Sequence, residues 1–354
     1  MDRRFKVAVL GCGRVSNRYR EVLADELADR VEVVGACDQR AERAEGFVAA
    51  TGGKAVADLE SLVALAPDLV CILTESGNHA RDALALLDRG CNVLIEKPVA
   101  LRIEDAEAIR DAAKRAGLTA AVVKQNRYNP AMRFVREKVE SGAFGRLISA
   151  EVRVHWCRYQ DYYDDGWHGT WKMDGGVLAQ QAIHHLDALQ WLGGPIARVC
   201  AVGHALANRL EAEDTAAAVV EFESGAVGTI VATTAARDRD FEASVQLVGT
   251  NARAKVGGSA LNRLENWFCV TADLSDQDAQ ERYSQEVPSS YGLGHGPLIQ
   301  DVLAAVADRT PPPVDVDSAM QSLRLMHALY ASMESGGWVA LKQGPVSDRL
   351  GLTA

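Results

Sequence analysis

The first third of the chain alternates short apolar runs with longer segments in which apolar residues recur at helical spacing. The helical spacing is clearest over residues 41–51 and 78–89, and the β-rich runs cover residues 5–10, 31–37, 69–73, 92–95 and 120–123. Strands separated by helices form βαβ units, whose strands run parallel and are covered by helices on both faces. The pattern therefore predicts an α/β fold, with a doubly wound parallel sheet over residues 1–123.

After about residue 146 the pattern changes to longer β-rich runs, over residues 147–156, 198–204, 216–223, 227–234, 243–249 and 252–256. Glu223-Ser224-Gly225 and Gly249-Thr250-Asn251 are typical of tight turns between antiparallel neighbours. Helical spacing returns over residues 176–192, 298–309 and 318–335. Residues 124–354 are therefore predicted to form an α+β domain with a large, mostly antiparallel open sheet, and the late helix is expected to pack back on the body.

Composition narrows the class of protein. The 354 residues are 48% hydrophobic and 24% charged, which is enough apolar material for a core in each of two domains. A net charge of -10 without a run of Lys or Arg argues against nucleic acid as a partner. We find no apolar stretch long enough for a membrane span, and no C-x-x-C pair among the seven cysteines. These features predict a cytoplasmic protein with reduced thiols and no metal site.

A glycine-rich segment follows the first predicted strand and opens a helix, with the sequence Gly11-Cys12-Gly13-Arg14-Val15-Ser16. In a Rossmann domain such a loop brings backbone N–H groups close to a dinucleotide pyrophosphate. Asp38 ends the second strand, where a carboxylate accepts hydrogen bonds from the ribose hydroxyls of NAD and repels the extra phosphate of NADP. The sequence therefore favours NAD, although Arg40 is placed to attract that phosphate and Asp38 could instead cap the next helix.

Two further segments carry candidate catalytic groups. Glu96-Lys97-Pro98 ends the strand at 92–95, and ligands of parallel sheets bind beyond the carboxyl ends of the strands. A partly buried lysine there can exchange a proton with a substrate hydroxyl. On the helix predicted at 176–192, Gln180 and His184 share one face and Asp187 follows one turn later. His184 can donate, accept or orient a proton.

Aromatic residues gather in one segment, where six of the 21 aromatic side chains lie within sixteen residues: Trp156, Tyr159, Tyr162, Tyr163, Trp167 and Trp171. The segment also holds charged groups such as Arg158 and Asp161, so it is not a simple core strand. It is either a long loop held down by aromatic anchors or a binding wall whose rings stack on a sugar or base. We favour the wall.

Together these motifs resemble the Gfo/Idh/MocA oxidoreductases over essentially the whole chain. The resemblance implies that Lys97 and His184 are the catalytic pair, assisted by Gln180, where much of the family has aspartate, while Asp187 matches the acid that follows the histidine. It also implies contacts of the cofactor NAD with Gly11, Gly13, Arg14, Val15, Asp38, Gln39, Thr74, Ser76, His79, Glu96, Lys97, Gln125 and Arg127.

Further motifs resemble a narrower group, the UDP-N-acetylglucosaminuronate (UDP-GlcNAcA) 3-dehydrogenases of the WlbA type. These motifs are Lys124-Gln125-Asn126-Arg127, Gly169-Thr170-Trp171, Asp174-Gly175-Gly176, Tyr162-Tyr163, Glu213-Asp214-Thr215, Gly257-Gly258 with Asn262 and Trp267, and Tyr291-Gly292-Leu293-Gly294-His295. That group carries an amide at the Gln180 position. The implied substrate contacts are Lys97, Asn126, Arg127, Arg158, Tyr163, Trp167, Trp171, Gln180, His184 and His185, with Arg158 or Arg127 binding the uronate carboxylate or the diphosphate.

The narrower resemblance implies oxidation of the sugar 3-hydroxyl by NAD, giving a 3-keto sugar for a pyridoxal-phosphate aminotransferase in surface-polysaccharide (lipopolysaccharide) synthesis. It also implies reoxidation of NADH by a 2-oxo acid such as 2-oxoglutarate, and a homotetramer. Three alternatives stay open: an NADPH-dependent 3-ketoreductase of a deoxysugar nucleotide, an inositol or free-sugar dehydrogenase, and a nucleotide-sensing regulator. The regulator would be expected to lack the lysine or the histidine, and this chain has both.

Overall fold

The computed structural model describes residues 4–271 and 274–352, which form two compact units. The first unit runs to Lys124 and includes His295–Met320, and the second contains Gln125–Gly294 and the chain from Gln321 onward. The change of unit at Lys124 lies one residue from the boundary that the sequence predicts. The sequence did not predict that residues 295–320 belong to the first unit. A local pattern does not indicate which sheet a late helix packs against.

The first unit contains a six-stranded, fully parallel sheet in the order β3-β2-β1-β4-β5-β6. Its strands are β1 (Phe5–Leu10), β2 (Val31–Cys37), β3 (Lys54–Val56), β4 (Leu69–Ile72), β5 (Val93–Ile95) and β6 (Ala120–Val122). Every residue of β4 and β5 is buried, as expected for strands covered on both faces. The sequence pattern missed β3, because its three residues are exposed or half-buried.

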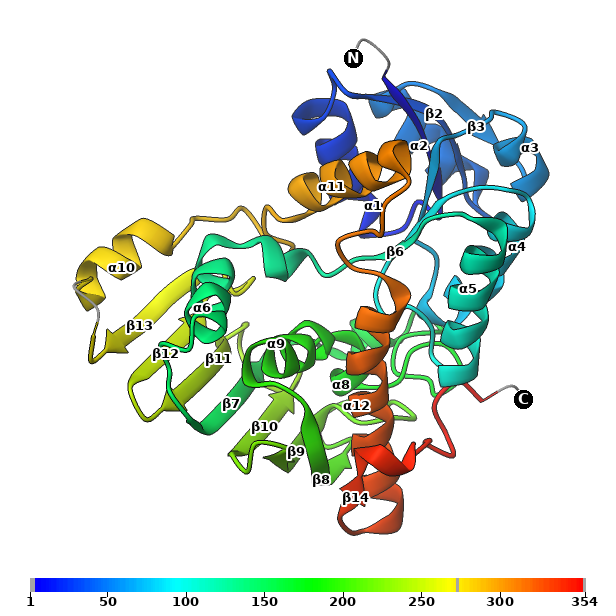
Figure 1. Ribbon diagram of the computed structural model, residues 1–354. Coiled ribbons are helices and arrows are strands. Elements are labelled where there is room, and N and C mark those ends of the chain that lie inside the picture. The colour runs from blue at the N-terminus through cyan, green and yellow to red at the C-terminus, as the bar shows by residue number, and fades with distance from the viewer. Residues whose placement is uncertain (1–3, 272–273, 353–354) are drawn as a thin grey trace. The chain divides into compact units, whose positions relative to one another are not determined.

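The helices of the first unit cover this sheet. They are α1 (Ser16–Glu21), α2 (Ala41–Thr51), α3 (Leu59–Val63), α4 (His79–Asp88), α5 (Ile103–Ala116) and α11 (His295–Asp308). A helical turn at Val22–Glu26 continues α1 and contacts α11, which Figure 1 shows in orange beside the blue N-terminal helices. Helix α5 buries Ala106, Ile109 and Ala113 on one face, which explains the helical spacing in its sequence.

The second unit contains an eight-stranded sheet in the order β13-β12-β11-β7-β10-β9-β8-β14. Its strands are β7 (Leu147–His155), β8 (Ile196–His204), β9 (Thr215–Phe222), β10 (Val227–Thr233), β11 (Glu242–Gly249), β12 (Ala252–Gly257), β13 (Arg263–Cys269) and β14 (Val339–Ala340). Only the β7–β10 pair among these is parallel, so the mostly antiparallel sheet is confirmed. Both predicted tight turns join antiparallel neighbours, β9 to β10 and β11 to β12.

Helices cover one face of the second sheet, as the green and yellow ribbons of Figure 1 show. They are α6 (Pro130–Glu140), α7 (Gln160–Tyr163), α8 (Val177–Gln180), α9 (Ile183–Gly193) and α10 (Asp276–Tyr283), and α12 (Val316–Ser335) contributes its later residues. Ser332 of α12 accepts a hydrogen bond from the backbone of β8. In β7, Ala150, Val152 and Val154 are buried, and α9 packs against this strand. The predicted single helix over residues 176–192 is wrong, since Gln181 and Ala182 separate α8 from α9.

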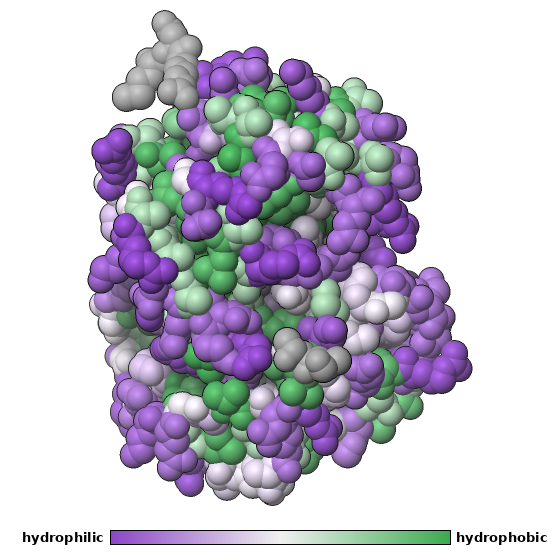
Figure 2. All heavy atoms as spheres, turned by 90° about the vertical axis from the view of Figure 1, so that its right-hand side faces the viewer, coloured by the Kyte–Doolittle hydropathy of each residue, from purple (hydrophilic) through white to green (hydrophobic). Residues whose placement is uncertain are grey.

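The surface seen in Figure 2 is largely hydrophilic, with apolar residues in small scattered groups. Within the described parts of the chain, no helix combines the length and the apolar character needed to cross a bilayer.

Candidate active site

The glycine loop between β1 and α1 has the turn that its sequence predicts. Gly11 has a φ of +92°, and a Cβ built there would lie 2.7 Å from the backbone carbon of Leu73. A Cβ on Gly13, in contrast, would meet no atom within 4 Å. The fold therefore requires the first glycine, whereas the second leaves open space beside the loop. This space fits the close approach of a dinucleotide phosphate.

Asp38 follows β2 directly and faces the glycine loop. Its Oδ2 accepts a hydrogen bond from the backbone N–H of Cys12 at 2.7 Å, and its Oδ1 accepts one from that of Arg40 at 2.8 Å. Helix α2 begins at Ala41 without a side-chain cap, so Asp38 does not have the capping role that the sequence left open. The carboxylate stands beside the loop, where a ribose is expected.

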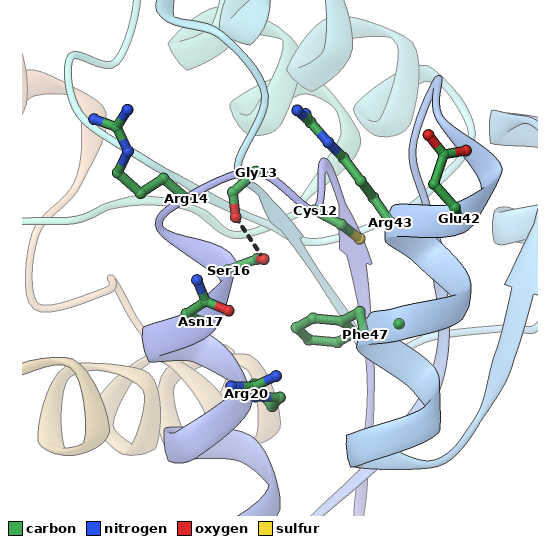
Figure 3. A pocket seen from close by; sticks show the side chains of 10 residues that line it. Cys12, Gly13, Arg14, Ser16, Asn17, Arg20, Glu42, Arg43 and Phe47 are labelled. Atoms are coloured by element: carbon green, nitrogen blue, oxygen red, sulfur yellow. Dashed lines mark hydrogen bonds between the residues drawn. The ribbon is translucent and has the colours of Figure 1, made fainter. Parts of the chain in front are cut away.

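An open pocket of about 370 Å³ lies between α1 and α2, next to the glycine loop (Figure 3). It is lined by Cys12, Gly13, Arg14, Ser16, Asn17, Arg20, Glu42, Arg43, Gly46 and Phe47. Figure 3 shows the side chains of Arg14 and Arg43 on either side of the loop. Three guanidinium groups against one carboxylate make the lining positive, which suits the phosphates of a nucleotide.

This arrangement predicts how Asp38 sets cofactor choice. In Asp38→Ser the carboxylate that repels a 2′-phosphate is gone, while Arg14, Arg40 and Arg43 remain. We expect the ratio of NADP to NAD affinity to rise by about tenfold or more, since two unit charges about 4 Å apart interact by about 1 kcal/mol in water and about 4 kcal/mol near a protein surface. Fluorescence titration with NADH and NADPH measures the ratio. An unchanged ratio in a folded variant would show that Asp38 does not discriminate between the two.

The segment after β4 is held by internal hydrogen bonds. Thr74 donates from Oγ1 to Asp82 at 2.8 Å. The ring nitrogens of His79 lie 2.7 Å from the Pro98 carbonyl oxygen and 2.9 Å from that of Thr74. Burial lowers the pKa of His79, and Ser76 is buried as well. His79 thus joins the segment after β4 to the one after Lys97, and contacts of these residues with NAD stay predictions.

Glu96 and Lys97 follow the carboxyl end of β5, as predicted. Glu96 is buried and accepts hydrogen bonds from Tyr19 Oη and from the backbone N–H of Lys97, each at 3.1 Å. His295 Nε2 lies 3.6 Å from the Glu96 carboxylate. Burial alone would raise the pKa of Glu96, but the hydrogen bond and charge of His295, with the charge of Lys97, bring the net pKa below its usual value. Glu96 therefore places a negative charge next to the half-buried Lys97.

In the second unit, His184 lies on α9 beside residues of the turn at Gln125–Tyr128. Gln125 Nε2 is 3.3 Å from His184 Nε2. One turn further along α9, Asp187 accepts two hydrogen bonds from Arg127, from Nε at 2.8 Å and from Nη2 at 2.7 Å. This bidentate pair fixes the helix turn that carries His184. Sequence reasoning expected Arg127 to contact ligands; the structure gives it a protein partner, and its ligand contacts stay predictions.

Two side-chain oxygens of the same turn, Gln125 Oε1 and Asn126 Oδ1, are buried without a hydrogen-bond partner among the described residues. A buried acceptor left without a donor is costly. Both residues were predicted to bind cofactor or substrate, and a hydroxyl or amide of a bound molecule would satisfy these oxygens.

His185 is placed differently from His184. Its side chain is 1% exposed and meets the Trp156 ring edge-on at 6.0 Å. Both ring nitrogens lack a hydrogen-bond partner in the described chain, and burial lowers the pKa of His185 to about 4. This environment is that of a neutral core histidine and lends no support to its predicted contact with substrate.

The aromatic segment contains both a stack and a set of anchors. The His168 ring lies 4.1 Å from Tyr162 and 3.7 Å from Trp167, and Arg158 lies over Tyr162 at 5.7 Å. These groups form a row of flat surfaces of the kind that binds sugars and bases. Arg158 also donates to Asp240 at 2.9 Å, a partner that sequence spacing could not reveal.

Other members of the segment hold it in place. Tyr163 is buried, its hydroxyl is 2.7 Å from Thr234 Oγ1, and burial raises its pKa to about 12. Trp171 packs edge-on against Tyr330 with ring centres 5.1 Å apart. Tyr163 and Trp171 therefore act as anchors of the segment, and binding of a ligand by the row of rings stays a prediction.

Two models of one oxidoreductase family match the chain. The NAD-binding Rossmann fold matches residues 5–124, and the C-terminal alpha/beta domain matches residues 136–341. The chain belongs to the Gfo/Idh/MocA oxidoreductase family. Its cofactor is accordingly NAD, as its glycine loop and Asp38 predict.

Solved family members include two that are similar over nearly the whole chain. The WlbA dehydrogenase from Chromobacterium violaceum, in complex with NADH and UDP-GlcNAcA, is 33% identical with a TM-score of 0.89, and 96% of each chain is covered. The WlbA dehydrogenase from Bordetella pertussis, with the same ligands, is 34% identical with a TM-score of 0.89, covering 96% of this chain and 98% of that one.

Curated relatives of the chain include reductases and dehydrogenases of different substrates. A 1,5-anhydro-D-fructose reductase from Ensifer adhaerens is 32% identical over 55% of this chain and 60% of its own length. A D-glucoside 3-dehydrogenase from Escherichia coli is 29% identical over 53% of this chain and 54% of its own. The chain thus spans little more than half the length of these two relatives. The family models show an oxidoreductase with an NAD-binding Rossmann fold, and they name no substrate.

No group of three or more His, Cys, Asp or Glu side chains in the described residues is arranged to hold a metal ion.

Proposed function

We propose that this enzyme oxidises the 3-hydroxyl of a UDP-N-acetylaminouronic acid, UDP-GlcNAcA, with NAD as the oxidant. The observation that carries the proposal is the similarity, over 96% of the chain, to two dehydrogenases solved with NADH and UDP-GlcNAcA. The row formed by Arg158, Tyr162, His168 and Trp167 supports it, because such a row offers both stacking surfaces and a cation to an anionic nucleotide sugar.

In the proposed reaction the 3-hydroxyl loses a proton and C3 loses a hydride, giving a ketone. NAD supplies the hydride acceptor. Lys97, half-buried at the carboxyl end of β5, accepts the proton directly or through His184. His184 is oriented by Gln125 and by the Arg127–Asp187 pair below it on α9. Glu96 supports Lys97 by accepting its backbone N–H.

Arg158 is the better candidate for binding the uronate carboxylate, because the guanidinium of Arg127 is already engaged by both oxygens of Asp187. Arg158 lies over Trp156 and Tyr162, and Asp240 holds one of its nitrogens. Its remaining N–H groups can form charge-assisted hydrogen bonds with a carboxylate or a diphosphate.

The proposal also includes the use of the product, the reoxidation of NADH and the oligomeric state. The 3-keto product is a substrate for a pyridoxal-phosphate aminotransferase in surface-polysaccharide synthesis. A 2-oxo acid such as 2-oxoglutarate would reoxidise NADH on the enzyme, and the protein would act as a homotetramer.

Mass spectrometry of UDP-GlcNAcA, incubated with the enzyme, NAD and 2-oxoglutarate, tests the proposal. We expect a product lighter by two hydrogen atoms, and no such product from the matched control UDP-N-acetylglucosamine, which lacks the carboxylate. Oxidation of both would contradict the role of the carboxylate. If neither reacts, the substrate is wrong, and reduction of keto-deoxysugar nucleotides by NADPH is the next reaction to examine, given the arginines of the pocket in Figure 3.

A further inference from the structure

Glu213 begins the motif Glu213-Asp214-Thr215 and is buried against the glycine that precedes α8. It is 3% exposed. A Cβ built on Gly176 would lie 2.2 Å from Glu213 Oε2 and 2.2 Å from the Glu213 carbonyl oxygen. Position 176 therefore has no room for a side chain, and what approaches the backbone at the paired glycines is the buried Glu213.

Glu213 holds the first turn of α8 through both its backbone and its side chain. Its carbonyl oxygen accepts the N–H of Val177 at 2.8 Å, and its Oε1 accepts the N–H of Leu178 at 3.0 Å. Tyr330 Oη, from α12, donates to the same Oε1 at 3.1 Å and accepts the N–H of Gly176 at 3.1 Å. Glu213 and Tyr330 thus satisfy three backbone N–H groups at the start of this short helix, which has no earlier turn to satisfy them.

The same turn is connected to the helix that carries His184. The carbonyl of Val177 accepts the N–H of Ala182 at 2.8 Å, and the carbonyl of Ala182 accepts the N–H of His185 at 2.8 Å. The position of α8 therefore fixes the first turn of α9, where His184 lies.

The two neighbouring carboxyl groups of the motif lie in opposite environments. Asp214 accepts hydrogen bonds from three successive backbone N–H groups, those of residues 206–208, at 2.8–2.9 Å. Within residues 4–271 and 274–352, in contrast, no group donates a hydrogen bond to Glu213 Oε2, which is buried. A buried carboxylate is costly unless donors or a cation compensate its charge. The surroundings of Glu213 therefore favour the protonated form.

The ionisable side chains that face Glu213 are Asp214, next to it in the chain, and Tyr330, from α12. Helix α8 contributes none, since residues 177–180 are Val-Leu-Ala-Gln, and β8 approaches with Gly203. Burial, together with the charge of Asp214, raises the pKa of Glu213 to about 7, despite the hydrogen bonds that its carboxyl group accepts.

We propose that Glu213 is a positioning residue that acts as a neutral acid and joins the start of α8 to α12 without placing a charge between them. Its Oε1 accepts the two hydrogen bonds, and Oε2 carries the proton beside Gly176. The ionised form would make the same two hydrogen bonds but would leave a charged oxygen buried without a donor. The contact therefore requires an acceptor oxygen and the size of the side chain, but not the negative charge.

Glu213→Gln tests whether the charge is needed, because its amide keeps an acceptor oxygen for Leu178 and Tyr330 and is uncharged. We expect kcat to stay within about twofold of wild type in Glu213→Gln and to fall about tenfold in Glu213→Ala, which leaves both donors unpaired. A Glu213→Gln protein that is unfolded, or as impaired as Glu213→Ala, would overturn the neutral acid. Full activity in Glu213→Ala would overturn the positioning role.

The pH dependence of stability provides a second test. Glutamate in an unfolded chain has a pKa of about 4.3, so between this value and about 7 the folded protein holds a proton at Glu213 that the unfolded chain has lost. The stability that this proton contributes is complete below the lower pKa and is lost as the pH rises through the upper one. Glu213→Gln has no such proton. We therefore expect its urea midpoint to rise relative to that of wild type between about pH 5 and about pH 8.

The control for this measurement is Glu223→Gln, which removes an exposed carboxyl group from the turn after β9. Its urea midpoint should keep a constant difference from that of wild type over the same pH range, and its kcat should be unchanged. If the difference between Glu213→Gln and wild type is equally constant, Glu213 is ionised throughout and the proposal is wrong.

Infrared spectroscopy detects the proton itself. At about pH 6 most carboxyl groups of a folded protein are ionised, so we expect the C=O band of a protonated carboxyl group in the difference between the spectra of wild type and Glu213→Gln. Absence of this band would overturn the proposal. Neither infrared spectra nor urea unfolding requires a substrate. If wild type does not oxidise UDP-GlcNAcA, only the proposed function fails, and the values of kcat are then compared on a sugar alcohol that wild type does oxidise.

Discussion

Replacing Lys97 with methionine is expected to lower kcat by about 10²–10⁴-fold, the range of general acid–base assistance. Lysine and methionine have unbranched side chains of similar length, so the space at the end of β5 stays filled while the proton acceptor is lost. The support that Glu96 gives to the backbone of residue 97 is kept, since it involves only the N–H group. Steady-state rates with NAD and the oxidisable sugar, together with NADH binding, measure the effect.

The control for Lys97→Met is Lys114→Met, which removes an exposed lysine from the last turn of α5 in the same unit. Its kcat should equal that of wild type. We expect both variants to bind NADH, because the glycine loop and Asp38 are untouched. A Lys97→Met enzyme that binds NADH and keeps kcat within tenfold of wild type would exclude Lys97 as the proton acceptor.

Replacing Arg127 with methionine is expected to lower the free energy of unfolding by about 3–5 kcal/mol, because it leaves a buried charge without its partner. Asp187 is 5% exposed and Arg127 is 11% exposed, and both carboxylate oxygens accept from the guanidinium. Activity should fall as well, since the pair fixes the turn of α9 that carries His184. Urea unfolding followed by circular dichroism measures the loss of stability.

An exposed pair of the same geometry provides the control. Arg198 on β8 donates to both oxygens of Glu221 on β9, at 2.8 and 2.7 Å, with 47% and 37% of the side chains exposed. Arg198→Met should cost less than about 1 kcal/mol, as surface ion pairs do. In Arg127→Met/Asp187→Leu both charges of the pair are removed, so much of the stability should return. Equal losses in Arg127→Met and Arg198→Met would contradict the importance of burial.

The local sequence predicts much of the first unit. Its buried strands appear as apolar runs, and the groups that matter in a parallel sheet follow those runs directly. The amino-acid pattern alone therefore places Gly11, Asp38 and Lys97 at the carboxyl ends of β1, β2 and β5. A strand that buries few residues has no such pattern, and β3 was missed for this reason. β13 was missed because charged and amide residues alternate with its buried residues.

The hydrogen-bond partners of the candidate site residues could not be predicted from the sequence. The local pattern showed that Gln180, His184 and Asp187 belong to one helical region, yet the interruption between α8 and α9 separates Gln180 from the other two. The ligand contacts expected of these residues, and of His185 and Tyr163, stay predictions.

By itself the sequence determined most of the strands, the parallel sheet of the first unit, the mostly antiparallel sheet of the second and the residue types available for chemistry. These follow from periodicity, which records burial along each element. Only the tertiary structure decided that Asp187 pairs with Arg127, that Asp174 accepts a hydrogen bond from Gln180 and that His295 lies near Glu96. A charged or polar side chain can pair with many partners at similar energy, so the packing of distant segments selects the partner that is within reach.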